Sequence, residues 1–285
     1  MSVQIVIDSA CDLPKSTADS LGLHFVSMRT IFGGVEYLDG VTLTGEEFYQ
    51  KLVESDSLPT TSQVPPAEFE EAFEKIVSQG DTALCITVSS GLSGTYQSAM
   101  IAAEAFGDKV IVVDSENVTI GEQLLVLRAV QLRNEGWSAW EMAEILNHEK
   151  KQIRLIALLD TLEYLKKGGR VSATAAFAGT LLSIKPVVAI ENGQIAMLGK
   201  ARGSRNGSNK LMEMVKQSNG IDFGRPLMLA YSGLSDALLQ KYIADSSELY
   251  EGKVEALPVC RIGSTIGTHA GPGAIALAFF ENKPA

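Results

Sequence analysis

The chain has 285 residues, of which 46% are hydrophobic and 20% are charged, and its formal net charge is −10. This is the composition of a folded globular protein long enough for two α/β domains, and it argues against disorder. Because binding to a phosphate backbone requires clustered lysine and arginine side chains, the negative charge also excludes nucleic acid as a partner.

Short β-branched runs alternate with longer helical patterns in the first half of the chain. Strands are predicted at residues 3–7, 84–88 and 110–113. Helices are predicted at residues 66–78, 96–106, 122–134 and 139–150. This alternation is typical of a parallel sheet, so we expect residues 1–150 to form an N-terminal α/β domain.

A hairpin changes the pattern in the second half. Two apolar runs flank Asn192-Gly193, and this pair favours a tight turn in which both residues have positive φ. Strands are predicted at residues 153–159, 186–190, 195–198, 227–231 and 254–259, and helices at 209–217 and 236–249. We therefore expect residues 151–285 to form a C-terminal domain of mixed α/β type whose last segment contributes to a ligand site.

The segment Ser90-Gly91-Leu92-Ser93-Gly94-Thr95 follows a predicted strand and opens a predicted helix. A glycine-rich turn before a helix directs free amides and the positive end of the helix dipole at one point, which suits an anion. A capped helix without a ligand is an equally good interpretation of this segment alone. The similar Ser232-Gly233-Leu234-Ser235 precedes Asp236, which would repel an anion, so it indicates a structural cap.

Two further segments carry polar groups suited to an acidic ligand. Residues 59–65 form a hydroxyl-rich loop bracketed by prolines, which alone indicates a helix cap and linker. Residues 263–273 contain four glycines around His269 and suggest close approach to a ligand. A histidine can donate a hydrogen bond to a carboxylate in either protonation state. His24 and His148 lack such neighbours and are predicted to be structural.

Basic loops with glycines occur at residues 166–170 and 200–205. Most such loops are solvated surface, but their arginines could engage phosphate or an acidic partner. No phosphate-binding loop, dinucleotide-binding motif or zinc motif occurs, so no ATP, nicotinamide or metal site is predicted. The separated Cys11, Cys85 and Cys260, and the lack of a leader or apolar span, favour a reducing cytoplasm.

Six segments in order resemble the DegV family over nearly the whole chain, namely Asp8-Ser9 with Asp12-Leu13 and residues 59–65, 89–98, 165–170, 181–186 and 267–273. The resemblance implies a two-domain α/β fold that encloses one long-chain fatty acid. It further implies the lipid-binding subunit of a bacterial fatty acid kinase in phospholipid metabolism, not an enzyme by itself. The kinase would be a separate protein, similar to dihydroxyacetone kinases, that supplies ATP and metal, so this chain needs no cofactor. Transient contact with a membrane surface is a further expectation.

The resemblance also assigns roles to residues from distant segments. A carboxylate buried without donors would offset much of the gain from burying its tail, so several donors are needed. The implied carboxylate ligands are Thr61, Ser62, Ser93 and His269. The residues implied to support them are Gly94, Thr95 and Thr268. The implied contacts to the kinase or to the acyl phosphate are Arg170 and Arg202.

Two alternatives stay open at this point. Ser93 with His269 as base could form an acyl hydrolase or transferase, because nucleophile and base need only meet in space. The G-x-S-x-G spacing of the lipase turn fails, however, since Thr95 stands where the second glycine belongs. The same helix start could instead belong to a binding module for a small phosphorylated metabolite.

Overall fold

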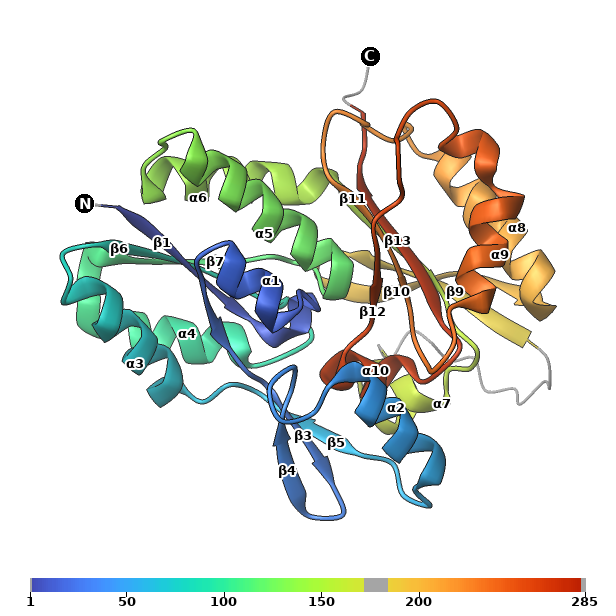
Figure 1. Cartoon of the computed structure of the whole chain (residues 1–285), viewed down its shortest axis with the longest axis horizontal. Helices are drawn as coiled ribbons and strands as arrows, with labels where there is room; N and C mark the ends of the chain where they lie inside the picture. Colours follow the sequence, from blue (N-terminus) through green and yellow to red (C-terminus); the bar gives the residue numbers. More distant parts are fainter. Residues whose placement is uncertain (1, 172–183, 283–285) are drawn as a thin grey trace.

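The computed structural model describes residues 2–171 and 184–282. Residues 181–183, part of the segment 181–186 named above, lie outside the described residues. Two halves, each built on its own sheet, stand side by side (Figure 1). Within the described ranges, no helix is long and apolar enough to cross a membrane.

The first half contains a sheet of four parallel strands in the order β2-β1-β6-β7. The strands are β1 (Val3–Asp8), β2 (Leu23–Val26), β6 (Thr82–Thr87) and β7 (Val110–Asp114). One face carries α1 (Lys15–Ser20), α5 (Thr119–Asn134) and α6 (Ala139–Glu149), and the other carries α3 (Pro66–Val77) and α4 (Thr95–Ala103). Because both faces are covered, the strands are almost wholly apolar, which explains why β1, β6 and β7 were predictable.

The second half contains a mixed sheet in the order β10-β9-β8-β13-β11-β12, antiparallel except between β11 and β12. The strands are β8 (Ile153–Leu158), β9 (Ile184–Glu191), β10 (Gln194–Arg202), β11 (Leu227–Tyr231), β12 (Val259–Arg261) and β13 (Ile275–Phe280). Helices α8 (Gly203–Gln217) and α9 (Ala237–Asp245) cover one face. The predicted hairpin is confirmed, with φ of 50° at Asn192 and 72° at Gly193.

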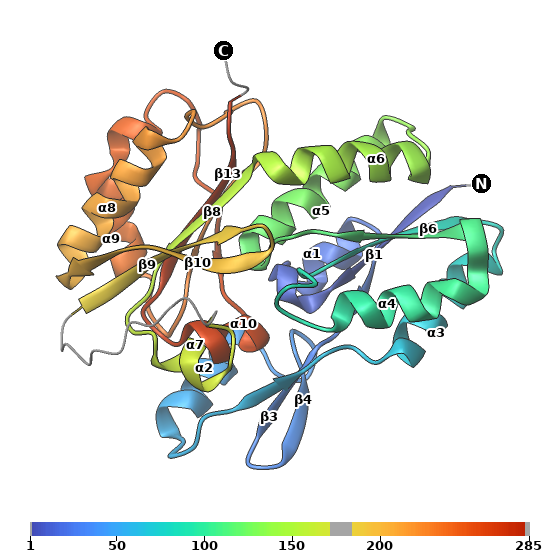
Figure 2. The ribbon, with the colours of Figure 1, turned by 180° about the vertical axis from the view of Figure 1, so that it is seen from behind.

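A smaller group of elements lies below both halves in Figures 1 and 2. It consists of the antiparallel sheet β4-β3-β5 and the helices α2, α7 and α10. Their bounds are β3 (Arg29–Phe32), β4 (Val35–Leu38), β5 (Thr60–Ser62), α2 (Gly45–Glu54), α7 (Glu163–Lys167) and α10 (Ser264–Ala270). Short 3-10 helices complete the described chain at Ser9–Cys11, Glu104–Lys109, Lys150–Gln152 and Ser247–Leu249.

Several elements of the second half differ in extent from their predictions: α8 and β10 are longer than the predicted 209–217 and 195–198, and two other predictions reach beyond the observed element. Of the strand predicted at 254–259, only Val259 lies in β12; Pro258 has no amide hydrogen for the ladder and supplies only its carbonyl, to Leu229 N. The helix predicted at 236–249 ends at Asp245, where Ser246 Oγ donates to the carbonyl of Tyr242 and competes with the helical bonds.

Helix α5 lies between the two sheets and joins the halves. It contacts β1 of the first sheet and β8, β11 and β13 of the second. One core cluster accordingly contains Ile5 and Leu84 from the first sheet together with Leu155 and Ala276 from the second. The architecture is thus the predicted α/β type, with a parallel sheet followed by a mixed one, and the two sheets share a core.

Candidate functional site

A cavity of about 380 Å³ lies between the second sheet, α10 and the segments that follow β5 and β6. This volume is within the range of roughly 300–1,000 Å³ found for sites that enclose small molecules. Most of its wall is apolar, and the part supplied by the second sheet and its flanks consists of Leu155, Ala157, Leu159, Val188, Ala189, Ile190, Ile195, Ala274 and Ala276. The cavity therefore suits the apolar body of a ligand.

Strand β13 shows why the sheet leaves this space open. Its side chains alternate, so that Ile275 and Leu277 pack beneath α8 and α9 while Ala276 and Ala278 face the other way. Ala276 lines the cavity and pairs across the strands with Ala157 of β8, which lines it too. Small side chains on this face leave unfilled the volume that large side chains occupy on the opposite face.

Polar side chains form one part of the wall, which we call the polar cluster: Thr61, Ser62, Gln63, Ser93, Arg170 and His269. They come from four segments that are far apart in sequence. Thr61 Oγ1 lies 2.9 Å from His269 Nε2, which joins β5 to α10. Arg170 Nε donates to the carbonyl of Leu92 over 3.2 Å, which joins the segment after α7 to the loop before α4.

Two close packing contacts complete the ring around the polar cluster. A Cβ on Gly94 would lie only 2.1 Å from the side-chain oxygen of Gln63, so these two residues are in close contact. His269 Nδ1 is likewise 2.1 Å from the Cβ position of Gly168, so only glycine fits beside the imidazole. The four segments are therefore in mutual contact around one opening.

Strand β5 places Thr61 and Ser62. It has only three residues and is held by antiparallel pairing with β3, in which Thr61 faces Thr30 and Ser62 faces Arg29. The register of this pair decides which hydroxyls reach the cavity. The position of β3 therefore determines the position of two predicted ligands.

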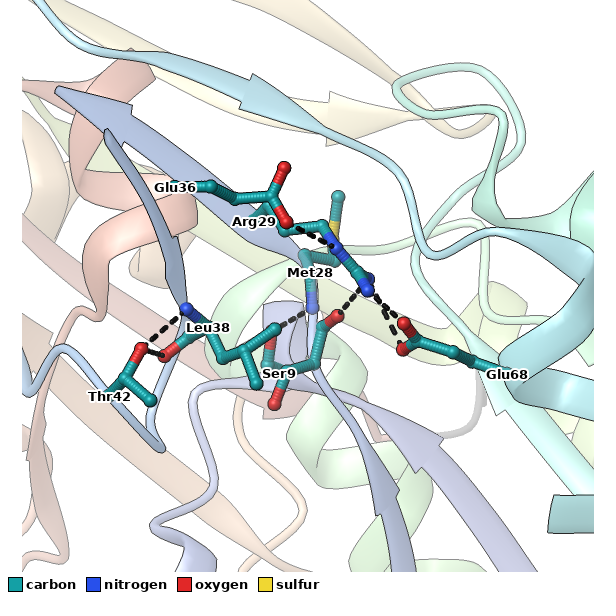
Figure 3. A network of polar contacts seen from close by, with 8 residues as sticks. Ser9, Met28, Arg29, Glu36, Leu38, Thr42 and Glu68 are labelled. Carbon is teal, nitrogen blue, oxygen red and sulfur yellow. Dashed lines mark hydrogen bonds and ion pairs between the residues drawn. The ribbon is translucent and has the colours of Figure 1, made fainter. Parts of the chain in front are cut away.

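Arg29 anchors β3 to its surroundings (Figure 3). Its guanidinium forms ion pairs with Glu36 of β4 and with Glu68 of α3. Just before the strand, Met28 N donates to Ser9 Oγ over 3.0 Å, in the turn that follows β1. The small sheet is thus fixed to the first half at two points.

His269 is carried by α10, in the segment whose four glycines predicted unusual backbone. Residues Ser264–Ala270 form a helix, and Gly267 allows it to pack closely, because a Cβ there would lie 2.6 Å from Phe48 and Tyr49. Gly271, with φ of 70°, follows the helix and turns the chain toward β13. The glycines therefore permit close packing around the helix as well as its end.

The imidazole of His269 is uncharged at neutral pH. Burial lowers its pKa to about 4, and the positive charge of Arg170 contributes to the lowering. Its Nε2 has Thr61 as a partner, whereas its buried Nδ1 has no hydrogen-bond partner among the residues that the structure describes. His269 can therefore act as a hydrogen-bonding group but supplies no charge at neutral pH.

Ser93 lies at the start of α4. Its Oγ accepts a hydrogen bond from Thr95 N over 3.2 Å and lies 2.9 Å from Thr95 Oγ1. Ser93 and Gly94 line the cavity, with Thr95 buried behind them, so the positive end of the α4 dipole faces the cavity. Among the described residues no hydrogen bond joins Ser93 to His269.

The second Ser-Gly-Leu-Ser segment has a structural role. Ser232 Oγ donates to the carbonyl of Gly271 and accepts from Ala274 N. It is not among the described residues that line the cavity, and it holds the loop that leads into β13. The interpretation of this copy as a structural element agrees with these contacts.

The structure brings together most of the predicted site residues. Those that line the cavity are Thr61, Ser62, Ser93, Gly94, Arg170 and His269. Thr268 does not reach it, because its hydroxyl is buried and donates to the carbonyl of Ser264 inside α10. Arg202 is exposed at the end of β10, outside the described cavity lining, so its role stays a prediction.

Other cavity residues were missed from the sequence. Gln63, whose amide nitrogen donates to Ser98 Oγ, and Thr265, whose side chain is buried, both line the wall. Thr265 could have been found, since it stands one helical turn before His269 and so shares its face. The alternation of alanine with large residues over 274–279 was a second available signal.

Comparisons with known proteins give one consistent result. The model of the DegV protein family matches residues 2–282. A DegV domain-containing protein of Caldanaerobacter subterraneus is 35% identical over 283 residues, which cover 99% of each chain. One from Deinococcus radiodurans is 34% identical and covers 98% of each.

Solved structures show the same fold. A fatty-acid-binding DegV family protein from Thermus thermophilus superposes with a TM-score of 0.88 at 31% identity and covers 99% of this chain and 100% of its own. A stearic-acid-binding protein from Eubacterium ventriosum gives a TM-score of 0.87 at 27% identity, covering 99% and 98%. DegV of Bacillus subtilis, a fatty acid binding protein, gives 0.85 at 28% identity, covering 99% and 100%.

Proposed function

The chain belongs to the DegV family, and on this basis we propose that it binds one long-chain fatty acid and presents the carboxylate to a separate kinase. The observation that carries the proposal is a mostly apolar cavity with hydroxyls, one imidazole and one arginine gathered on one part of its wall. The kinase, similar to dihydroxyacetone kinases, supplies ATP and metal, and the product is an acyl phosphate.

The apolar wall accounts for the tail. A sixteen-carbon acid carries about 14 methylenes, and burial at about 0.8 kcal/mol each gives roughly 11 kcal/mol before ordering costs. Side chains such as Val188, Ile190 and Ile195 offer contacts along the chain without polar groups that would need partners. The free energy gained by burying the acyl chain supports tight retention of the ligand.

The Thr61–His269 pair is proposed to bind the carboxylate of the fatty acid. His269 is neutral, and its Nδ1 faces Gly168 with no hydrogen-bond partner in the described ranges 2–171 and 184–282. Burying a bare lone pair costs less than burying an N–H without an acceptor, so the hydrogen belongs on Nε2, which donates to Thr61 Oγ1. The hydroxyl hydrogen of Thr61 is then free to bind a carboxylate oxygen. Ser62 and Ser93 add two further hydroxyls.

The exposure of the polar cluster supports presentation to a partner. Gln63, Gly94 and Arg170 are exposed although they line the cavity, so this part of the wall reaches the surface. Arg170 places a positive charge beside His269, where it stabilises the carboxylate and then the acyl phosphate. Arg202 is proposed as a further contact to the kinase.

The two alternatives receive less support. Ser93 Oγ contacts Thr95, and His269 Nε2 contacts Thr61, so the described geometry supplies no base for a serine nucleophile. A small phosphorylated metabolite would leave most of the apolar wall uncovered.

Native mass spectrometry of the purified protein tests the binding step. We expect a mass increase equal to one long-chain fatty acid, released on denaturation. A protein without bound lipid that also fails to take up hexadecanoic acid would refute the binding step. Formation of an acyl-serine adduct with acyl esters would support the hydrolase instead.

Reconstitution with a fatty acid kinase tests the presentation step. Arg170→Gln and Arg202→Gln together should keep the fatty acid bound but lower the rate of acyl phosphate formation at least tenfold, because each removes a charge and a planar donor group. Arg154→Gln is a matched control, because Arg154 pairs with Glu281 outside the cavity lining. An unchanged rate in the double variant would show that neither arginine takes part.

A further inference from the structure

Two carboxylates from the first forty residues hold the start of α10. Gly263 N donates to Asp12 Oδ1 over 2.8 Å, and Ser264 N donates to Asp39 Oδ1 over 2.9 Å. Ser264 Oγ also donates to Asp39 Oδ1, over 2.7 Å. The residue before the helix is Gly263, which has no side chain to cap it, so these carboxylates take over the free amides at the helix start.

The same helix is tied to the small sheet at both of its ends. At the start, Thr30 Oγ1 of β3 lies 2.8 Å from Ser264 Oγ. At the end, Thr61 of β5 bonds to His269. Thr30 and Thr61 are cross-strand neighbours, so α10 lies across two adjacent strands with one hydroxyl contact at each end.

Asp12 connects this helix to a second part of the cavity wall. Its Oδ2 accepts a hydrogen bond of 2.6 Å from the hydroxyl of Thr119, a residue that lines the cavity at the start of α5. Asp12 is buried and has φ of 54°, a conformation that aspartate and asparagine adopt more readily than most residues. One side chain therefore sets the relative position of α5 and α10.

We propose that Asp12 and Asp39 are positioning residues of the carboxylate-binding group, which act through α10 to hold His269 against Thr61. This inference rests on the proposed function. A seven-residue helix is not stable on its own, so its place depends on its end contacts. Loss of either carboxylate frees the helix start, and the imidazole five or six residues later then loses its alignment with Thr61.

The test separates recognition of the head from burial of the tail. We would compare the affinities of tetradecanoic acid and 1-tetradecanol, which share a chain but differ in the carboxylate, for each variant. Asp39→Ala and Asp12→Ala should reduce the preference for the acid about tenfold while the affinity for the alcohol stays within about twofold. Asp12→Asn should restore the preference, since it keeps an acceptor for Gly263 N and can bond to Thr119.

Two further variants guard against a general loss of stability. Thr30→Val removes a single hydroxyl at a buried position and should lower the preference about threefold even if the aspartate variants do not fold. Ser138→Ala removes the cap of α6, outside the cavity lining, and should destabilise the fold without changing the preference.

The outcomes distinguish this inference from the proposal on which it rests. Equal weakening of acid and alcohol in the folded aspartate variants, or an unchanged preference in Thr30→Val, would overturn the positioning role while the fatty acid function stands. A wild-type protein that binds neither probe, or binds both equally, would overturn the carboxylate site itself and the positioning role with it.

Discussion

Filling the cavity from the second sheet should change which chain lengths the protein accepts. Ala276 lines the cavity, and Ala276→Leu adds three carbon atoms to that wall. If each added carbon atom displaces one methylene of the ligand, an acyl chain that fills the cavity binds more weakly by about 2.4 kcal/mol, or roughly sixtyfold. Shorter chains should lose less, so the optimum shifts by about three carbons.

The neighbouring alanine on the same face provides the control. Ala278 is fully buried in the shared core and does not belong to the described cavity lining. Ala278→Leu should therefore overpack the core and cost about 1–3 kcal/mol of unfolding free energy without changing the chain-length profile. Ala276→Leu has room for its side chain and should cost less.

The assay is calorimetric titration with saturated acids of eight to eighteen carbons, together with urea unfolding of the ligand-free variants. An unchanged profile in Ala276→Leu, or the same shift in Ala278→Leu, would show that the tail does not lie along this face. The assignment of the alanine-lined wall would then be wrong.

Three further predictions concern the polar cluster. Thr61→Val should weaken binding of tetradecanoic acid by about 1.5–3 kcal/mol, measured by titration, with little effect on 1-tetradecanol; equal loss for both would contradict the role of the hydroxyl. Gly168→Ala should also weaken binding of tetradecanoic acid with little effect on 1-tetradecanol. Its φ of −76° accepts alanine, but the added Cβ would lie 2.1 Å from His269 Nδ1 and displace the imidazole. Unchanged acid binding would show that the imidazole is not needed in this place. The pKa of His269 falls from 6.5 to about 4 on folding, so between these values the unfolded chain binds a proton that the folded protein does not, and stability falls as pH falls. Urea unfolding of wild type between pH 7.5 and pH 5 should therefore lose about 2 kcal/mol more than His269→Gln, and equal losses would refute the lowered pKa.

The predictable parts of the fold were those with a local signal. Asn192-Gly193 specifies its turn by itself, because both residues tolerate positive φ, and the hairpin follows. The strands of the first sheet are apolar on both faces and stand out for that reason. These elements needed no knowledge of distant residues.

The parts that could not be predicted depend on contacts between distant residues. β5 is three polar residues long and becomes a strand only because β3 pairs with it. α10 contains Gly267 in its middle, which disfavours a helix, yet remote carboxylates at Asp12 and Asp39 cap it. The meeting of Thr61 with His269 follows from both elements, so the sequence supported it through family resemblance alone.

The position of α5 limits how a ligand can enter. Because this helix is packed between both sheets, swinging the halves apart would bring side chains such as Leu124, Leu125 and Val126 into water at about 25 cal/mol for each Å² uncovered. Separating the halves is therefore costly. For the lipid proposed above, we expect exchange to proceed by displacement of short surface segments instead.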